Sequence, residues 1–292
     1  MTSPEPTAES SGRIIRSDAH ATDVRRDHHR LHRGIYTPLA SELSTTDRIR
    51  AAAMRAGDGA VVAGLSAAIL HGTTFVDEDH DVELIRGLDG QGRMRGSVRV
   101  IRTDQLGPGD IEMVEGIRVT SPVRTAYDLG RRRPDWMALA RLDDLVRATQ
   151  LSLTELWSYT RAHPRTHGVP QMRELIHHID PAAESPGESW LRLVMIRNHL
   201  PRPDSQIVLT DTDGRMIARF DLGYKRYKLG IDYDGIEFHT SDEQRAHDAR
   251  RDRAARDRGW EAIRVAGTLL SRDPCAVINT IENAMRQRGY RP

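Results

Sequence analysis

Met216-Ile-Ala-Arg-Phe-Asp-Leu-Gly-Tyr-Lys-Arg-Tyr-Lys-Leu-Gly-Ile-Asp-Tyr-Asp-Gly235 is the stretch from which the architecture of the C-terminal half follows. Apolar and polar side chains alternate in both halves of it, which indicates two strands, with Asp221 on the more polar face of the first. A short turn at Arg226-Tyr227 would join the strands as a hairpin. That register places Asp221 directly opposite Asp232.

Two carboxylates in opposed positions repel each other, because the Cβ atoms of paired residues are only about 5 Å apart. At an effective dielectric constant of ~20 the repulsion is of order 3 kcal/mol. The sequence therefore predicts either an acid with a raised pKa or a cation between the two acids. Asp234 lies on the same face, which predicts a magnesium site made by Asp221, Asp232 and Asp234. The alternative is that Asp232 and Asp234 only end a strand before a turn at Gly235.

A fourth acid, Glu188, begins the helix that precedes this hairpin. Ser185-Pro-Gly-Glu188 has the spacing of a capping box, in which Ser185 accepts from the backbone and Glu188 reaches back to it. Capping alone explains the glutamate. The partial positive charge of a helix N-terminus also keeps a carboxylate ionised and available to a metal ion.

The order of elements around the hairpin is typical of a small mixed sheet covered by helices, which is an α/β arrangement. Periodicity and capping signals predict helices over residues 186–199, 242–258 and from 274 onward. Strands are predicted over residues 206–210, 216–224, 228–233 and 260–265. Turn-forming residues over 180–187 indicate a domain boundary. The preceding half mixes short strands with helices and is predicted to be α+β.

Composition excludes several classes of protein. The 43 basic and 42 acidic residues leave a net charge of +1, so a bulk polycation that coats nucleic acid is excluded. A single cysteine, Cys275, excludes an internal disulfide and fits a reducing compartment. The longest apolar stretch, residues 60–70, is too short to span a membrane, and we expect a cytoplasmic protein. Residues 1–12 are predicted to be a disordered tail.

Residues 185–292 resemble the actinobacterial proteins related to very-short-patch repair (Vsr) endonucleases, within the restriction-endonuclease-like PD-(D/E)XK superfamily. The motifs that carry this resemblance are Ser185-Pro-Gly-Glu-Ser-Trp-Leu-Arg192, Arg219-Phe-Asp-Leu222, Leu229-Gly-Ile-Asp-Tyr-Asp-Gly235 with His239, and Asp257-Arg-Gly-Trp260 with Ile263-Arg-Val265. The resemblance implies a restriction-endonuclease-like mixed sheet and DNA hydrolysis dependent on Mg²⁺, for which Mn²⁺ substitutes.

The same resemblance assigns roles to individual residues. It implies Asp221 as the hairpin aspartate, Asp232 as the second acidic ligand and Glu188 as the helix acid. Asp232 stands where glutamate is more usual, and Asp234 occupies the usual lysine position. The departure at the lysine position leaves activation of the attacking water unassigned. His239, whose unperturbed pKa near 6.5 suits proton transfer, is the candidate for this role. Its alternative is an ordinary loop histidine.

Residues 13–180 resemble the antitoxin component of type IV abortive-infection systems, the AbiEi-like proteins. Three segments carry this second resemblance, namely Leu31-His-Arg-Gly-Ile-Tyr-Thr-Pro38, Val62-Ala-Gly-Leu-Ser-Ala-Ala-Ile-Leu-His-Gly72 and Gly116-Ile-Arg-Val-Thr-Ser-Pro-Val-Arg-Thr-Ala-Tyr-Asp-Leu129. Two hypotheses follow. The first is a metal-dependent endonuclease in DNA repair or defence against foreign DNA, with DNA and a repair protein as partners. The second is an AbiEi-like DNA-binding antitoxin that restrains a partner toxin and carries an inactive nuclease fold.

Overall fold

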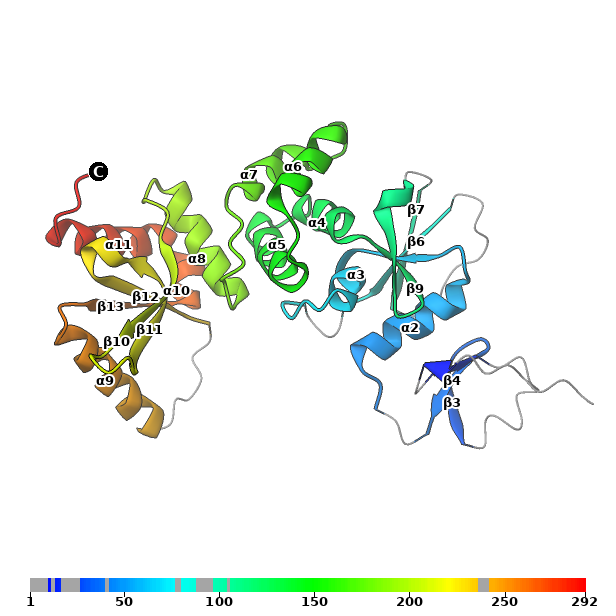
Figure 1. The fold of residues 1–292 in the computed structure, drawn as a ribbon, viewed down its shortest axis with the longest axis horizontal. Coiled ribbons are helices and arrows are strands. Elements are labelled where there is room, and N and C mark those ends of the chain that lie inside the picture. Colours follow the sequence, from blue (N-terminus) through cyan, green and yellow to red (C-terminus); the bar gives the residue numbers. More distant parts are fainter. Residues whose placement is uncertain are drawn as a thin grey trace, which may run out of the picture. The chain divides into compact units, whose positions relative to one another are not determined.

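Two compact units make up the chain. The computed structural model describes residues 10–11, 14–16, 27–39, 42–76, 80–87, 97–103, 106–235 and 242–292. Unit 1 comprises residues 1–129 and 148–166, and unit 2 comprises residues 130–147 and 167–292. Both units combine helices with sheets, which confirms the predicted mixture of α and β structure (Figure 1). This division differs from the predicted domains 13–180 and 185–292, because unit 2 includes segments that precede residue 180.

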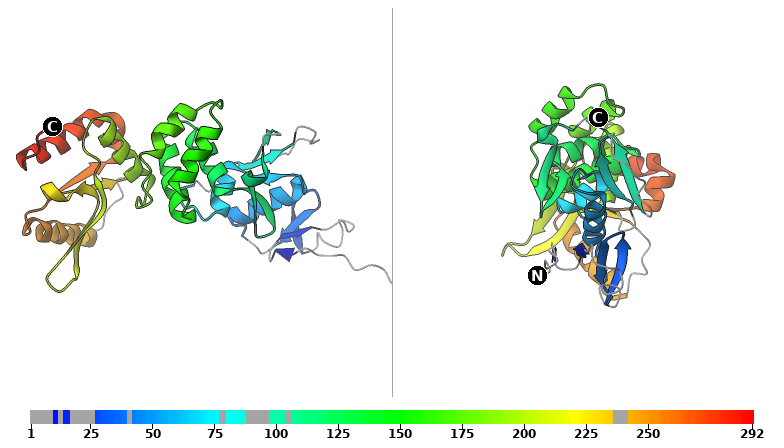
Figure 2. Two further views of the ribbon diagram at one scale, coloured as in Figure 1. Left: turned by 45° about the horizontal axis from the view of Figure 1, so that its top comes forward. Right: turned by 90° about the vertical axis from the view of Figure 1, so that its right-hand side faces the viewer.

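Unit 1 contains two sheets, one of four strands in the order β1-β2-β4-β3 and one of five in the order β7-β6-β5-β9-β8 (Figure 2). The strands of this unit are β1 (Ser10–Ser11), β2 (Ile14–Arg16), β3 (His28–His32), β4 (Ile35–Pro38), β5 (Val61–Val62), β6 (Val82–Arg86), β7 (Val98–Arg102), β8 (Ile111–Val114) and β9 (Ile117–Thr120). Its helices are α2 (Thr45–Ala56), α3 (Gly64–Leu70), the 3-10 helix η1 (Pro108–Asp110), α4 (Pro122–Gly130) and α6 (Leu153–Ala162).

Burial of apolar side chains between α2, α3 and the five-stranded sheet forms the core of unit 1. Ile49, Val62, Leu84 and Val119 are all fully buried there. Ser44 caps α2 with a complete capping box. Ser10 and Ser11 pair with β2 as a short strand. The other residues of the predicted tail, 1–9 and 12, lie outside the described residues.

Unit 2 is built around a four-stranded mixed sheet in the order β10-β11-β12-β13. Its strands are β10 (Asp204–Thr210), β11 (Met216–Tyr224), β12 (Leu229–Asp234) and β13 (Glu261–Ala266). Its helices are α5 (Asp135–Thr149), α7 (Val169–Ile176), α8 (Pro186–Arg197), the 3-10 helix η2 (Lys225–Tyr227), α9 (Asp242–Arg256), α10 (Gly267–Arg272) and α11 (Pro274–Gln287). Strands β10, β11 and β12 are antiparallel neighbours, whereas β12 and β13 are parallel.

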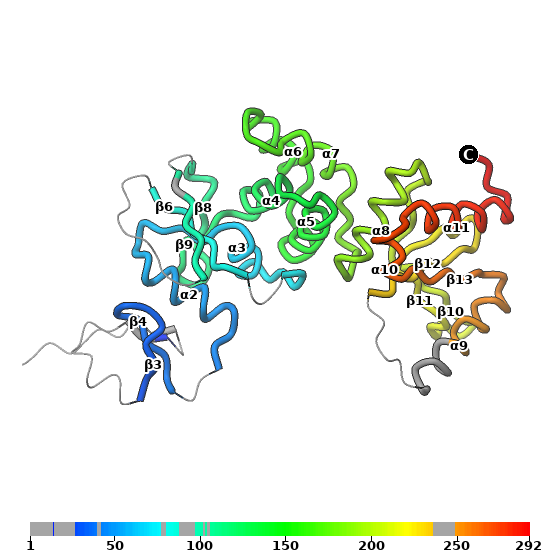
Figure 3. Tube along the Cα trace, turned by 180° about the vertical axis from the view of Figure 1, so that it is seen from behind, coloured from blue at the N-terminus to red at the C-terminus, as the bar shows by residue number. Residues whose placement is uncertain are grey.

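Helices cover both faces of this sheet (Figure 3). Apolar residues of α8, α10 and α11 pack against one face in a single core cluster. Helix α9 covers the opposite face, where Ala255 packs with Phe220 and Trp260. Within the described residues no helix is both long enough and apolar enough to cross a membrane.

The apolar side chains of β11 do not all pack on one face of the sheet, because their alternation breaks at Asp221. Leu222 packs with Leu229 and Ile231 in the cluster under α8. Phe220 instead belongs to the cluster under α9, where its ring lies against Gly230 so closely that a Cβ would meet it at 2.3 Å. Because Phe220 and Leu222 pack on opposite faces, the strand backbone is irregular at the residue between them.

Candidate functional site

The hairpin of β11 and β12 has the register that the sequence predicts. Leu222 lies opposite Ile231, and Tyr224 lies opposite Leu229. The turn differs from the expected two-residue turn, because residues 225–227 form a 3-10 helix and Lys228 adopts a left-handed conformation with φ 48°. The backbone ladder between the two strands ends at Leu222 and Ile231, immediately before the two aspartates.

Asp221 and Asp232 continue the pairing of the two strands with their side chains. The backbone N–H of Tyr233 donates to Oδ2 of Asp221 at 2.8 Å, and the backbone N–H of Asp221 donates to Oδ1 of Asp232 at 3.4 Å. Each carboxylate thus satisfies a backbone donor that the interrupted ladder leaves without a carbonyl acceptor. This capping role is structural, and it also holds both carboxylates close together at the end of the hairpin.

Glu188 lies in the first turn of α8 and is 5% exposed. Its backbone N–H donates to Oγ of Ser185 at 3.2 Å, as the predicted helix cap requires. Its carboxylate reaches one residue further back than a capping box predicts and accepts from the N–H of Glu184 at 3.0 Å. The same oxygen accepts from Nε2 of Gln206 at 2.8 Å. Two donors therefore fix this carboxylate in a buried position.

Gln206 is a residue of the site that sequence reasoning missed. It lies in β10 between Ser205, which pairs with Leu222, and Ile207, which pairs with Phe220, so it faces Asp221 across the strands. Its φ of 51° is in the left-handed region, which a glutamine adopts at a conformational cost. Glutamine in a strand carries no local signal of that backbone conformation, and the contact with Glu188 could not be read from the sequence.

The three acids influence one another electrostatically. Burial raises the pKa of Asp221 to about 6, and the negative charges of Glu188 and Asp232 raise it further against the hydrogen bond from Tyr233. Burial also raises the pKa of Asp232, and the neighbouring Arg251 guanidinium opposes that rise. One of the two outcomes predicted for opposed carboxylates, an acid with a raised pKa, is therefore present in the structure.

Arg251 supplies the cation of this site and is the second residue that sequence reasoning missed. Its Nη2 lies 2.5 Å from Oδ2 of Asp232 and 3.2 Å from Oδ1 of Asp252. Its guanidinium also lies over the Phe220 ring, 5.7 Å from the centroid. Helix α9 carries many arginines and aspartates, and its sequence gives no reason to select this arginine, because its partner Asp232 is 19 residues away.

Two further predicted site residues remain: Asp234 is exposed at the end of β12, and His239 lies outside the described residues. Among the residues that the structure describes, no group of three or more His, Cys, Asp or Glu side chains is placed to hold a metal ion. The magnesium site made by Asp221, Asp232 and Asp234 stays a prediction. Its second aspartate already has a guanidinium as its counter-charge.

Replacing Asp221 by asparagine is expected to stabilise the protein at neutral pH. A carboxyl whose pKa is raised in the folded state does not change the free energy of unfolding below about pH 4, where it is protonated in both states. It lowers the free energy of unfolding progressively as pH rises from about 4 to 6, and the full loss remains above pH 6. The amide oxygen of the new asparagine still accepts the Tyr233 N–H, so the variant should gain about 1 kcal/mol at pH 7.5, a value reduced for partial solvent exposure, and nothing at pH 4. Urea unfolding at both pH values measures the difference.

Asp213→Asn is the matched control, because this aspartate lies in the exposed β10–β11 turn with 68% of its side chain accessible. It should change the unfolding free energy by less than about 0.5 kcal/mol at either pH. If Asp221→Asn is instead less stable than the wild type at pH 7.5, the charged Asp221 carboxylate does not destabilise the folded protein, and the prediction is wrong.

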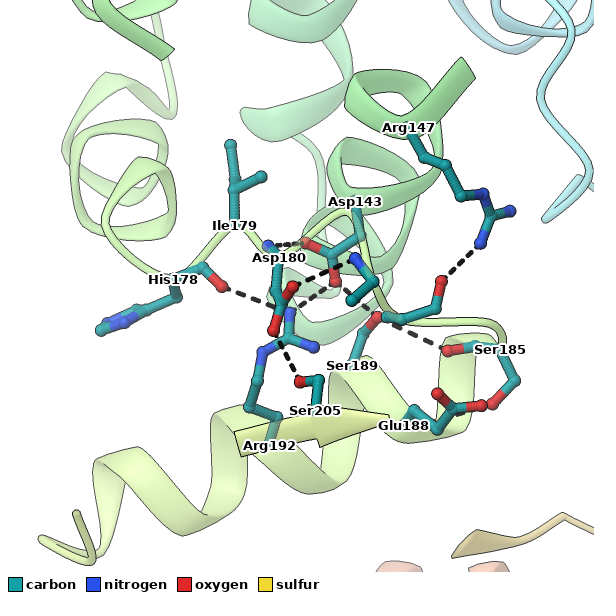
Figure 4. A network of polar contacts seen from close by, with 12 residues as sticks. Asp143, Arg147, His178, Ile179, Asp180, Ser185, Glu188, Ser189, Arg192 and Ser205 are labelled. Atoms are coloured by element: carbon teal, nitrogen blue, oxygen red, sulfur yellow. Dashed lines mark hydrogen bonds and ion pairs between the residues drawn. The ribbon is translucent and has the colours of Figure 1, made fainter. Parts of the chain in front are cut away.

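A second polar network in unit 2 joins α5 to α8 (Figure 4). Asp143 and Arg192 are both fully buried and form an ion pair, with Nη2 of Arg192 2.5 Å from Oδ2 of Asp143. Asp143 also accepts from Oγ of Ser189 at 2.6 Å and from the backbone N–H of Asp180 at 2.8 Å. Asp180 in turn accepts from Oγ of Ser205 at 2.6 Å. We call these five residues the Asp143 network, and its shielding from solvent indicates a structural role.

Unit 1 has a polar network of its own, centred on Asp110, which is 6% exposed. Its Oδ2 accepts from Nη1 of Arg124 at 3.1 Å and its Oδ1 accepts from the hydroxyl of Tyr159 at 2.6 Å. Nε of Arg124 also donates to Asp128 at 2.8 Å, one helical turn away. Arg124 and Asp128 thus form an ion pair within helix α4. This network connects η1, α4 and α6.

Comparisons with known proteins support one of the two family resemblances and not the other. Residues 60–177 match the model of the AbiEi antitoxin C-terminal domain. Two uncharacterized proteins of Mycobacterium tuberculosis, MT2308 of strain CDC 1551 / Oshkosh and Rv2248 of strain ATCC 25618 / H37Rv, are each 30% identical over 243 residues, which is 82% of this chain and 86% of the relative. No solved structure matches the protein. The AbiEi-like resemblance is thus supported, and none of these matches supports a Vsr-related nuclease over residues 185–292.

Proposed function

We propose that the protein is an antitoxin-like regulator. The chain belongs to the family of these mycobacterial proteins. Its residues 60–177 match the AbiEi antitoxin C-terminal domain. In this proposal the protein restrains a partner toxin and contacts DNA, and the acids of unit 2 serve the fold. The match over residues 60–177 is the observation that carries the proposal.

The structure of the matching segment is consistent with a binding scaffold. Both carboxylate oxygens of Asp110 have donors, one from Tyr159 and one from Arg124. A buried network whose partners are satisfied holds its elements rigidly. A rigid surface is what recognition of a folded partner requires, because it reduces the entropy that is lost on binding.

A coexpression experiment tests the proposal. The gene next to the one encoding this protein is induced in a heterologous host, with and without coexpression of the full chain, and surviving colonies are counted. We expect the neighbour alone to reduce survival by about 100-fold and the full chain to restore it, since tight binding of a toxin removes its free pool. A neighbour that is harmless, or whose toxicity the chain leaves unchanged, would refute the antitoxin function.

The same experiment separates the regulator from the nuclease. A variant that combines Asp221→Asn with Asp232→Asn removes the charge of both acids and keeps their size. If the acids serve only the fold, this variant restores survival as well as the wild type does. Loss of protection in a variant that still folds would show that the acids take part in the function.

Endonuclease activity is the second candidate, and the observation that favours it is the electrostatic coupling of Asp221 with Glu188 and Asp232. A bound Mg²⁺ would supply a polarised phosphate oxygen and a water of lowered pKa. The described residues do not form a ready site for that ion, because Arg251 already neutralises Asp232 and Asp234 is exposed. The nuclease therefore ranks below the regulator.

Magnesium binding is measurable without activity. If the acids hold Mg²⁺, 5 mM of the ion should raise the melting temperature of the wild type at pH 7.5 and leave Asp221→Asn unchanged, because a ligand that binds only the folded state stabilises it. Equal melting temperatures with the ion and with chelator in the wild type would remove the magnesium-dependent nuclease from consideration.

A further inference from the structure

Three segments that are distant in sequence meet at one end of the unit 2 sheet. They are residues 225–228 at the hairpin turn, residues 256–261 between α9 and β13, and residues 286–291 at the end of α11. Nζ of Lys228 donates to the carbonyl of Arg258 at 3.1 Å. Nη1 of Arg288 donates to the carbonyls of Gly259 and Tyr227 at 2.9 and 3.2 Å. The rings of Tyr227 and Tyr290 pack edge to face at 5.7 Å.

Positive charge is concentrated in these three segments, which we call the basic end. They contain eight basic residues and two acidic ones, a surplus of six, whereas the whole chain has a surplus of one. The rest of the chain therefore carries a net charge of −5. The basic residues are Lys225, Arg226, Lys228, Arg256, Arg258, Arg286, Arg288 and Arg291. The only two lysines of the chain are among them.

Acids among the described residues neutralise only a small part of this charge. Lys228 donates to a carbonyl oxygen, and Arg288 divides its contacts between two carbonyls and the carboxylate of Glu261 at 3.0 Å. A carbonyl oxygen holds a cation in place without cancelling its charge. The other pairing is between Arg286 and Glu282 at 2.7 Å, with an arginine side chain that is 54% exposed, so solvent screens it strongly.

A structural explanation accounts for part of this arrangement. Cations are favourable at the C-termini of α9 and α11, where the helix dipoles are negative, and this explains Arg256 and Arg286. It does not explain Lys225 and Arg226, which are exposed at the hairpin turn. It also does not explain why a third segment contributes cations to the same end of the sheet.

We propose that the basic end is a contact surface for the phosphodiester backbone of duplex DNA. This inference rests on the proposed DNA contact of an antitoxin-like regulator and locates it in unit 2. None of the large exposed hydrophobic side chains of the described residues lies in the three segments. Protein interfaces normally bury an apolar centre, whereas a backbone of phosphates is bound by arginine and lysine side chains. The chemistry of the basic end therefore favours DNA over an acidic protein.

The test compares two variants of the full chain with equal loss of charge. The first combines Lys225→Ala, Arg226→Ala, Arg258→Ala and Arg291→Ala. The control combines alanine substitutions of four exposed arginines outside the basic end, Arg33, Arg161, Arg165 and Arg215. Fluorescence anisotropy of a labelled 20-base-pair duplex gives affinity between 50 and 200 mM salt, and circular dichroism verifies folding. A parallel titration uses polyglutamate as competitor at equal charge concentration.

We expect the basic-end variant to bind about 100-fold more weakly at 100 mM salt, and its salt dependence, the slope of log K against log salt concentration, to be shallower by about 3. The control should change affinity by less than about threefold. If the wild type binds DNA and the two variants weaken equally, the surface is assigned wrongly while DNA binding stands. If the wild type binds no duplex, this surface and the DNA contact of the proposed function both fall, whereas restraint of the toxin is decided separately by the coexpression experiment. If polyglutamate displaces the duplex as well as unlabelled DNA does, the surface binds acidic protein.

Discussion

Replacing Arg192 by methionine is expected to lower the free energy of unfolding of unit 2 by about 3 to 5 kcal/mol, because the change leaves the carboxylate of Asp143 buried without its cation. Both side chains are fully inaccessible to solvent. Methionine matches the length of the arginine stem, so the cavity term is small and the loss reports mainly on the unpaired charge. Urea unfolding followed by tryptophan fluorescence measures it.

Tryptophan fluorescence suits this measurement. Trp136, Trp190 and Trp260 lie in unit 2, and the first two stack with ring centroids 5.0 Å apart. The fourth, Trp157, lies in unit 1 and is removed by Trp157→Phe in the background for both variants. The matched control is Arg197→Met, which breaks ion pairs of a partly exposed arginine and should cost no more than about 1 kcal/mol.

A double variant tests the mechanism. The substitution Asp143→Asn removes the buried charge, its single amide oxygen still accepts from the Asp180 N–H, and its amide NH₂ takes the position facing Oγ of Ser189, a hydroxyl that also accepts hydrogen bonds. Asp143→Asn combined with Arg192→Met should therefore be more stable than Arg192→Met alone, by about 1 to 2 kcal/mol. A double variant that is less stable than Arg192→Met would mean that the cost comes from lost packing of the arginine stem.

The Asp143 network also bears on where one folding unit ends. Asp143 lies within the segment that matches the AbiEi domain, yet its partners Ser189 and Arg192 lie in α8, beyond residue 177. The predicted boundary at residues 180–187 rests on turn-forming residues, which report local chain reversal and not packing. If Arg192→Met lowers the unfolding midpoint seen through Trp136 as much as that seen through Trp260, α5 unfolds together with the sheet of unit 2.

Sequence reasoning was most accurate where the determinants are local. The register of Asp221 against Asp232 follows from alternating polarity and a short turn, and the cap at Ser185 follows from a spacing of three residues. The contacts that neutralise or constrain the acids are distant in sequence, as with Arg251 for Asp232 and Gln206 for Glu188. Such pairs depend on how helices pack over the sheet. Hydrophobic periodicity identifies the packed face but does not select one arginine on a helix that has many.

The break in β11 shows a different limit. The alternation along residues 216–224, broken only by the apolar Ile217, predicts that Phe220 and Leu222 share one face, but they pack in different clusters. Both sides of the sheet are covered by helices, so an apolar side chain is buried whichever way it points. Alternation therefore specifies the face only when one face meets water. In unit 2, Gly230 determines the face on which Phe220 packs, because its missing Cβ leaves room for the Phe220 ring.

Phe220→Ala is expected to destabilise unit 2 by about 3 to 5 kcal/mol, through lost apolar burial and the cavity that remains. The phenylalanine is fully buried, and its ring stacks on Trp260 with centroids 5.8 Å apart. Gly230 packs against the ring and has no side chain that could fill the resulting cavity. Urea unfolding gives the loss, and the fluorescence of Trp260 reports the change in its surroundings. Val208→Ala in neighbouring β10 is the control, since Val208 is 50% exposed and should cost less than about 0.5 kcal/mol.

The same substitution should also alter the acids, because the Phe220 ring supports the guanidinium that neutralises Asp232. Burial raises the pKa of Asp232 and Arg251 opposes that rise, so an arginine that loses its aromatic contact opposes it less. We therefore expect Phe220→Ala to raise the pKa of Asp232, as followed by the carboxyl ¹³C shift during a pH titration. A pKa that stays constant while stability falls would mean that the ion pair alone holds Arg251 in place. Packing on the α9 face would then be independent of the charge balance at the end of the hairpin.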